Sequence, residues 1–276
     1  MHEKVDLSIN TELARQILTG FIRTEITRAG FSHAVIGLSG GIDSALSCYL
    51  TAEALGPDNV LAIRMPYKTS SQESLEHAQM IIDDLGVQSE TVEITPMVDP
   101  LFERFPDANQ MRKGNAMARE RMIILFDQSV AFNGLVVGTG NKTEILLGYT
   151  TLYGDSAAAL NPIGDLYKTQ VRQLSRAIGV PEAIVSKAPT ADLWVGQTDE
   201  GELGFSYAEV DQLLYLLVDE RYSPEDAVEA GFPKAFVEDV VRRVRRNHFK
   251  RVMPPIAKLS NRTIGYDFLY LRDWGT

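Results

Sequence analysis

One strand–turn–helix unit near the N-terminus constrains the fold of this chain more than any other feature. The apolar residues 34–36 (AVI) run directly into residues 37–44 (GLSGGIDS), and residues 45–55 then show the three- and four-residue apolar spacing of a helix. The paired glycines let backbone N–H groups approach an anion closely, and the dipole of the following helix favours negative charge there. The unit therefore predicts a phosphate-binding turn.

Side chains of the same turn add ligands for a nucleotide and its metal. Ser39 and Ser44 carry hydroxyl donors, and Asp43 can hold a Mg²⁺ ion that also binds phosphate oxygens. The turn lacks the lysine of the G-x-x-x-x-G-K-[ST] loop, so it is not the loop that cradles β- and γ-phosphates. The alternative is a plain turn that needs two glycines, but such a turn requires neither the serines nor Asp43.

Apolar segments and helical patterns alternate along the chain as far as residue 178. Strands are expected at 33–38, 59–65, 87–94 and 134–139, and helices at 8–29, 45–55, 70–85, 113–132 and 166–178. Ser70-x-x-Glu73 predicts a capping box at the start of the third helix. This order predicts an α/β fold with a doubly wound parallel sheet, whose ligands lie beyond the carboxyl ends of the strands. The turns at 39–44, 64–68 and 139–144 should therefore line one site.

The pattern changes after residue 187. Residues 188–204 are rich in Gly, Asp and Glu without a clear period, which is typical of either a surface connection or a mobile lid, and their length favours a lid. Helices are expected at 206–218, 223–230 and 233–248, followed by a tail that contains prolines. No internal repeat or linker is visible, so residues 1–276 are expected to form a single domain.

Charge and hydropathy exclude several classes of protein. The net charge is −10 and the pI is about 5.0, which disfavours non-specific binding to nucleic acid. No apolar run is long enough to span a membrane, and residues 1–6 do not resemble an export signal, so a cytoplasmic location is expected. The single cysteine, Cys48, excludes an intramolecular disulfide and a multi-cysteine metal site.

A second turn follows the fourth expected strand. Residues 138–144 (GTGNKTE) open a helix, with Thr139 placed to contact phosphate or ribose and Glu144 on the first helical turn. Because Mg²⁺ in proteins takes one or two carboxylates together with phosphate oxygens, Asp43 and Glu144 predict a metal site. Taken alone, Glu144 would be an exposed helical carboxylate.

Several further motifs resemble those of NAD synthetases, which are ligases of the N-type ATP pyrophosphatase superfamily. The shared stretches, in the order that the family has them, are GLSGGIDS at 37–44, KGNAMARERM at 113–122, GTGNKTE at 138–144, TLYGD at 151–155, GDLYKTQV at 164–171, KAPTADLW at 187–194 and DEGELGFSY at 199–207. The resemblance implies a doubly wound fold and a homodimer that binds its dinucleotide substrate at the subunit interface.

The resemblance also assigns roles to particular residues. Those implied in ATP binding are Gly37, Leu38, Ser39, Gly40, Gly41, Ile42, Asp43, Ser44, Arg64, Met65, Thr139, Lys168 and Thr190. Those implied in binding the dinucleotide are Arg119, Lys250 and Arg251. Asp43 and Glu144 would hold Mg²⁺. A solvated charge on a helix face is the alternative for Arg119, for Lys168 and for the basic cluster at 242–251.

In that family, nicotinic acid adenine dinucleotide is amidated to NAD in two steps. ATP first activates the substrate carboxylate as an acyl adenylate, and pyrophosphate leaves into the glycine turn; ammonia then attacks the acyl carbon and AMP is released. Lys168 would supply positive charge in the first step, and Asp155 would take a proton in the second. The alternative for Asp155 is a structural turn residue beside Gly154.

Two segments depart from the ammonia-dependent bacterial enzymes. Those enzymes often carry a lysine and an aspartate where this chain has Leu152 and Ala159, and residues 151–155 look more like synthetase domains fused to a glutaminase. A basic His-Lys pair near the C-terminus is matched only loosely by residues 248–251. Because residues 1–276 contain no match to a glutaminase, free ammonia is the expected nitrogen donor.

Two other functions use the same phosphate-binding turn. One is another adenylating ligase, such as a tRNA sulfurtransferase, although such enzymes typically need further cysteines or an RNA-binding domain. The other is a non-catalytic nucleotide-binding relative, which Leu152 and Ala159 suggest and which Asp43, Glu144 and Lys168 argue against.

Overall fold

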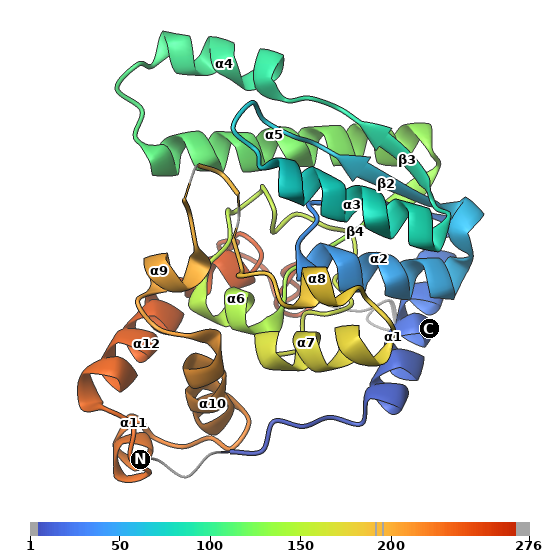
Figure 1. Cartoon of the computed structure of the whole chain (residues 1–276). Helices are drawn as coiled ribbons and strands as arrows, with labels where there is room; N and C mark the ends of the chain where they lie inside the picture. The colour runs from blue at the N-terminus through green and yellow to red at the C-terminus, as the bar shows by residue number, and fades with distance from the viewer. Residues whose placement is uncertain (1–4, 191, 195, 269–276) are drawn as a thin grey trace.

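A four-stranded parallel sheet in the order β3-β2-β1-β4 forms the centre of the molecule (Figure 1). The computed structural model describes residues 5–190, 192–194 and 196–268. The strands are β1 His33–Gly37, β2 Val60–Arg64, β3 Gln88–Thr91 and β4 Gly134–Val137. The chain moves outward from β1 to β3 and then returns to the other side of β1 with β4. Ligands of such sheets bind at this reversal, beyond the carboxyl ends of the two strands.

Helices cover both faces of the sheet. They are α1 Thr11–Arg28, α2 Ile42–Leu55, α3 Gln72–Leu85, α4 Thr95–Arg104, α5 Gln110–Ala131, α6 Lys142–Leu147, α7 Lys168–Ala177 and α8 Glu182–Val185. Ala34 and Ile36 of β1 pack with α1, α2 and α7, whereas Val35 between them packs with α4 and α5. Because both faces are buried, β1 and β2 have continuous apolar sequences rather than alternating ones.

The remaining helices form a third core beside α6 and α7 (Figure 1). They are α9 Asp199–Leu203, α10 Tyr207–Val218, α11 Pro224–Glu229 and α12 Lys234–Arg246. Leu203, Leu213 and Val240 of this group pack with Leu147 of α6. None of the helices in the described ranges is both long and apolar enough to cross a membrane.

The predicted α/β fold is confirmed, and the differences are local. The capping residue of α3 is Ser71, not Ser70, and its hydroxyl accepts a hydrogen bond from the Ser74 N–H. Helix α4 was not predicted, because two prolines lie within its ten residues. Strand β3 covers only part of the expected 87–94, and the expected lid at 188–204 contains the short helix α9.

Candidate active site

The glycine turn between β1 and α2 is braced by its own serines. Ser44 Oγ accepts a hydrogen bond from the Ser39 N–H at 3.3 Å, lies 3.1 Å from Ser39 Oγ, and donates to the Gly41 carbonyl at 2.9 Å. Helix α2 begins at Ile42 without a side-chain cap. Its first-turn N–H groups are therefore open to an anion, where the helix dipole favours negative charge.

Gly40 lets this turn lie against α3. Its φ is +78°, in the left-handed region, and a Cβ at this position would lie 2.1 Å from the Ser74 carbonyl oxygen. A side chain is therefore excluded both by backbone conformation and by contact. Gly41 differs, because its φ is −87° and a Cβ there would meet only Ser39 Oγ, at 3.4 Å.

We expect Gly40→Ala to lower the free energy of unfolding by at least about 2 kcal/mol, because it combines a left-handed alanine with a backbone clash. Gly41→Ala is the matched control, and it should stay within about 1 kcal/mol of the parent chain. Urea unfolding of the two variants makes the comparison. Equal stability of the two would show that the turn does not depend on the Gly40 conformation.

Lys168 joins the two side chains that the sequence predicts as metal ligands. Its Nζ lies 2.5 Å from Asp43 Oδ2 and 3.0 Å from Glu144 Oε1. Asp43 lies in the first turn of α2, Glu144 in the first turn of α6, and Lys168 is the first residue of α7. The N-termini of three helices thus bring together one cation and two carboxylates.

The ammonium group of Lys168 is almost fully enclosed. Its side chain is 3% exposed, and those of Asp43 and Glu144 are 17% and 16% exposed. Burial lowers the pKa of Lys168, but Asp43 and Glu144 outweigh burial and raise the pKa, so the lysine is charged. Burial also raises the pKa of Glu144, an effect that Lys168 opposes and Asp43 increases. A cation held by these two carboxylates would favour the ionised form of Glu144, as Lys168 already does.

Asn141, whose role the sequence analysis missed, orients both carboxylates. It is fully buried and caps α6, with its side chain accepting a hydrogen bond from the Glu144 N–H at 3.0 Å. Its Nδ2 donates to Asp43 Oδ1 at 2.9 Å. The signal was present in the sequence, because Asn141-x-x-Glu144 has the spacing of a capping box.

Asp211 of α10 fixes the start of α7 from the other side. It is fully buried and accepts hydrogen bonds from the Thr143 hydroxyl at 2.5 Å and the Thr169 N–H at 2.8 Å. Thr143 Oγ1 in turn accepts from the Lys168 N–H at 3.0 Å. The available signal for Asp211 was its helical spacing from the buried residues Tyr207 and Leu214 of α10, because a buried charge needs dedicated partners.

A cleft of about 820 Å³ opens at the carboxyl ends of the strands. The predicted site residues that line it are Gly37, Leu38, Ser39, Arg64, Met65, Thr139, Asp155 and Lys250. They come from the ends of β1, β2 and β4 and from the segments that close the cleft, as the parallel sheet predicts. Asp43, Glu144 and Lys168 do not line the cleft themselves, but Asp43 belongs to the same glycine turn as Ser39, which does.

Asp155 and Lys250 form another part of the cleft wall. Asp155 Oδ1 accepts a hydrogen bond from the Thr151 N–H at 2.7 Å within a tight turn. The Asp155 side chain lines the cleft, and desolvation by the surrounding protein raises its pKa. Lys250 Nζ donates to the carbonyls of Gly148 and Thr150, both at 2.7 Å. A carboxylate with a raised pKa that faces a cleft is suited to accept a proton.

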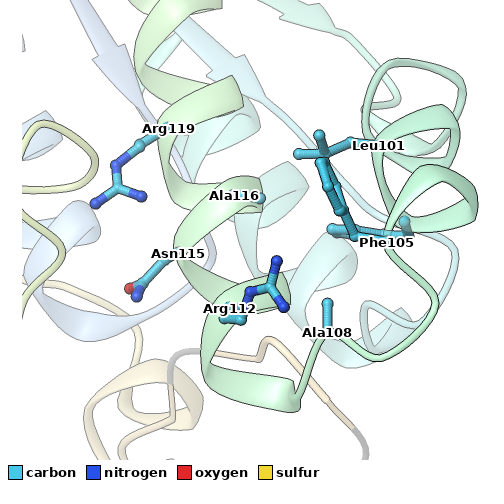
Figure 2. A pocket seen from close by; sticks show the side chains of 8 residues that line it. Leu101, Phe105, Ala108, Arg112, Asn115, Ala116 and Arg119 are labelled. Atoms are coloured by element: carbon cyan, nitrogen blue, oxygen red, sulfur yellow. The ribbon is translucent and has the colours of Figure 1, made fainter.

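Two residues predicted to bind substrate lie outside this wall. Arg119 Nε donates to the Leu152 carbonyl at 3.3 Å, and Arg119 lines a separate hollow of about 260 Å³ where α4 meets α5 (Figure 2). The Arg251 guanidinium donates to the carbonyls of Leu146 at 2.7 Å and Val244 at 2.9 Å. Arg251 therefore joins α6 to α12.

Contacts with α3 and α5 hold Asp192 and Leu193, which lie between α8 and α9, at the cleft. Asp192 Oδ2 accepts a hydrogen bond from the Ser71 N–H at 2.9 Å, at the N-terminus of α3, and Thr190 Oγ1 accepts from the Asp192 N–H at 3.1 Å. Leu193 lines the cleft and packs so closely on Gly114 of α5 that a Cβ at Gly114 would lie 2.9 Å from Leu193 Cδ1. These contacts are those of a covering segment, not of a loose surface connection.

Comparison with known proteins gives the family of this chain. A family model described as NAD synthase matches residues 14–254. The chain belongs to the NAD synthase family. The NH₃-dependent NAD⁺ synthetase of Trichlorobacter lovleyi is 61% identical over 98% of both chains. Among solved structures, NMN synthetase from Francisella tularensis is 32% identical with a TM-score of 0.80, over 92% of this chain and 100% of that one. The NH₃-dependent NAD synthetase from Campylobacter jejuni is 32% identical with a TM-score of 0.78, over 91% and 100%.

Membership of the NAD synthase family confirms the predicted family, fold and ligase class, with ATP as co-substrate. The same comparison bears on the motif at residues 151–155, which resembles that of glutaminase-fused synthetases. The T. lovleyi protein is ammonia-dependent and aligns along nearly its whole length. The local likeness of this segment to glutaminase-fused synthetases therefore does not extend to the chain as a whole.

Proposed function

We propose that this cleft is where the NAD synthase-family chain amidates nicotinic acid adenine dinucleotide with ammonia and ATP, releasing NAD, AMP and pyrophosphate. The observation that carries the proposal is the Lys168 ammonium group, fixed between Asp43 and Glu144 beside an open glycine turn. A carboxylate oxygen does not leave at neutral pH, so the substrate carboxylate must first be activated. Attack of that carboxylate on the α-phosphate forms the acyl adenylate and expels pyrophosphate.

The phosphates of ATP would lie on the glycine turn, with the adenine toward the end of β2. Gly37 to Ser44, Thr139, Lys168 and Thr190 form the proposed phosphate and ribose side, and Arg64 and Met65 the adenine side. The open N–H groups of α2 stabilise the charge that develops on pyrophosphate, because they are already oriented before the reaction begins. Lys168 adds a fixed positive charge next to the same turn.

Mg²⁺ fits this arrangement. Asp43 and Glu144 offer oxygen donors only, and in the part of the chain that the structure describes no three His, Cys, Asp or Glu side chains gather into a metal site. Mg²⁺ typically combines one or two carboxylates with phosphate oxygens. Asp43 and Glu144 would therefore hold it together with ATP, and the bound ion would neutralise phosphate charge.

The second step takes place on the acyl carbon of the adenylate. Ammonia attacks as neutral NH₃, and Asp155 accepts a proton from the nitrogen as the bond to AMP breaks. The raised pKa of Asp155 makes it a stronger base than an exposed aspartate. The covering segment, held by Asp192 at the start of α3, keeps water from hydrolysing the adenylate.

A mononucleotide substrate is the second candidate, because the F. tularensis relative in structure is an NMN synthetase. We expect kcat/KM with nicotinic acid adenine dinucleotide to exceed that with nicotinic acid mononucleotide by at least about 10-fold, since the second nucleotide adds binding contacts. Parallel assays with ATP, Mg²⁺ and ammonium make the comparison. The reverse preference would assign the chain to mononucleotide amidation.

We further propose that residues 1–276 form a single synthetase domain, that the protein is cytoplasmic and that it forms a homodimer. The α4–α5 surface supports the homodimer because it is apolar and open. Its exposed side chains include Met97 and Leu101 of α4, Phe105 just after α4, and Ile123, Phe126 and Val130 of α5. Figure 2 shows Leu101 and Phe105 beside the hollow that Arg119 lines. A second subunit on this surface would cover the hollow, and Arg119 is one of the residues that line it.

We expect light scattering at micromolar concentration to give twice the chain mass of 30.6 kDa. Leu101→Glu should shift the protein toward the monomer, because it puts a charge into an apolar interface. Lys234→Glu on α12 is the control for an added negative charge at an exposed site. A fully active monomer of the parent chain would refute the homodimer.

A further inference from the structure

Arg121 is a cation inside the cleft that the motif-based assignments left without a role. It lies on α5 and lines the cleft, and its Nε donates to the Met65 carbonyl at 3.0 Å. That bond fixes the guanidinium plane at the end of β2, next to the proposed adenine side. The donors on its two terminal nitrogens remain for another partner.

The charge of Arg121 is poorly compensated by the protein. Burial lowers its pKa to about 10, while Asp192 and Asp155 act in the opposite direction from outside ion-pair distance. Among the residues that the structure describes, no carboxylate forms an ion pair with Arg121, whereas Lys168 has two such partners. A mostly enclosed guanidinium without a counter-ion is costly, and an anionic ligand would remove that cost.

Arg119, two positions earlier, cannot take this place. Two residues on a helix point about 200° apart around the axis, so the two guanidinium groups lie on different sides of α5. In Figure 2 the Arg119 side chain extends from α5 on the side opposite Leu101 and Phe105, and it lines the smaller hollow. Arg121 alone of the two lines the large cleft.

We propose that Arg121 binds a reacting oxyanion, either the carboxylate of the dinucleotide or the α-phosphate of ATP. This inference rests on the proposed function. Both anions must meet in the cleft, and both match the planar fork of a guanidinium. Asp155 and Asp192 line the same cleft and repel anions, so a cation near them favours the approach of two negatively charged reactants.

The test compares Arg121→Gln with the parent chain in equilibrium binding of four ligands. They are nicotinic acid adenine dinucleotide, NAD, AMP and α,β-methylene-ATP with Mg²⁺. The first two differ only in carboxylate against neutral amide, which isolates a contact to the carboxylate. Arg176→Gln is the matched control, because Arg176 is exposed and paired with Glu182. Arg121→Lys keeps the positive charge but lacks the planar guanidinium, and it replaces Arg121→Gln in these measurements if the glutamine variant unfolds.

If Arg121 contacts the carboxylate, Arg121→Gln should raise the Kd of the acid dinucleotide about 10- to 100-fold and the Kd of NAD by less than about 2-fold. This is the loss expected for a charge-assisted hydrogen bond. If Arg121 contacts the α-phosphate, the affinities for AMP and the ATP analogue should fall by the same factor, and the affinities for both dinucleotides should not change. If Arg121→Gln weakens the binding of all four ligands equally, or of none, the inference is overturned and Arg121 only supports Met65. If the parent chain itself fails to bind the acid dinucleotide, the proposed function fails instead, and the ATP-analogue arm still tests Arg121.

Discussion

Lys168→Met is expected to lower kcat by a factor of about 10³ with the fold retained. The lysine supplies the fixed positive charge beside the phosphate turn, and losing one preorganised charge of this kind typically costs 10²- to 10³-fold. The fold survives because Glu144 can take up a proton once the cation is gone. Burial and Asp43 already raise the pKa of Glu144, and Lys168 is the group that opposes this rise. The variant should therefore also bind Mg²⁺–ATP less tightly.

Two further variants separate chemistry from stability. Lys168→Arg keeps the charge, but its fork cannot match two carboxylates placed for a single nitrogen at 2.5 and 3.0 Å, so we expect partial activity. Asp211→Asn loosens the start of α7 without touching the ammonium group. Thermal unfolding and pyrophosphate release are measured for each variant. Full turnover by folded Lys168→Met would remove Lys168 from the mechanism.

Asp155→Asn is expected to slow amide formation by about 10²-fold or more while adenylate formation changes little, because only the second step needs a base. Pyrophosphate release reports the first step, and NAD formation reports the second. The carboxamide keeps the size of the side chain and can still accept a hydrogen bond from the Thr151 N–H. The turn should therefore persist in the variant.

The pH dependence of amide formation gives Asp155 a second signature. Desolvation by the protein around the cleft raises the pKa of Asp155, so the parent chain should lose amide formation as the pH falls toward that raised value and the base becomes protonated. Above it, the rate should still climb between about pH 7 and 9 with the fraction of neutral NH₃. Asp155→Asn should retain only the dependence on NH₃. Equal loss in both half-reactions would instead make Asp155 a turn residue.

Local sequence predicted the parts of the site that are local. The glycine turn is contained within residues 37–44, and its chemistry follows from glycine conformation and from the start of a helix. Asp43, Glu144 and Lys168 were predicted by position in motifs, and the structure brings them together although up to 125 residues separate them. The parallel order of the strands explains this meeting, because their carboxyl ends share one edge.

The contacts that hold the site could not be read in the same way. Asp211 reaches Thr143 across 68 residues, and Asp192 reaches Ser71 across 121, so neither pairing follows from spacing. Arg119 and Arg121 belong to one motif, and only the rotation of α5 decides which of them faces the cleft. Sequence patterns predicted most of the elements, with α4 as an exception, whereas the rotation of each helix depends on packing.

The most direct test incubates the purified chain with ATP, Mg²⁺, ammonium and nicotinic acid adenine dinucleotide, and follows AMP, pyrophosphate and NAD together. The three products should form in equal amounts, and no NAD should form when glutamine replaces ammonium. Formation of ADP and phosphate, or adenylation without any NAD at saturating ammonium, would contradict the proposed function.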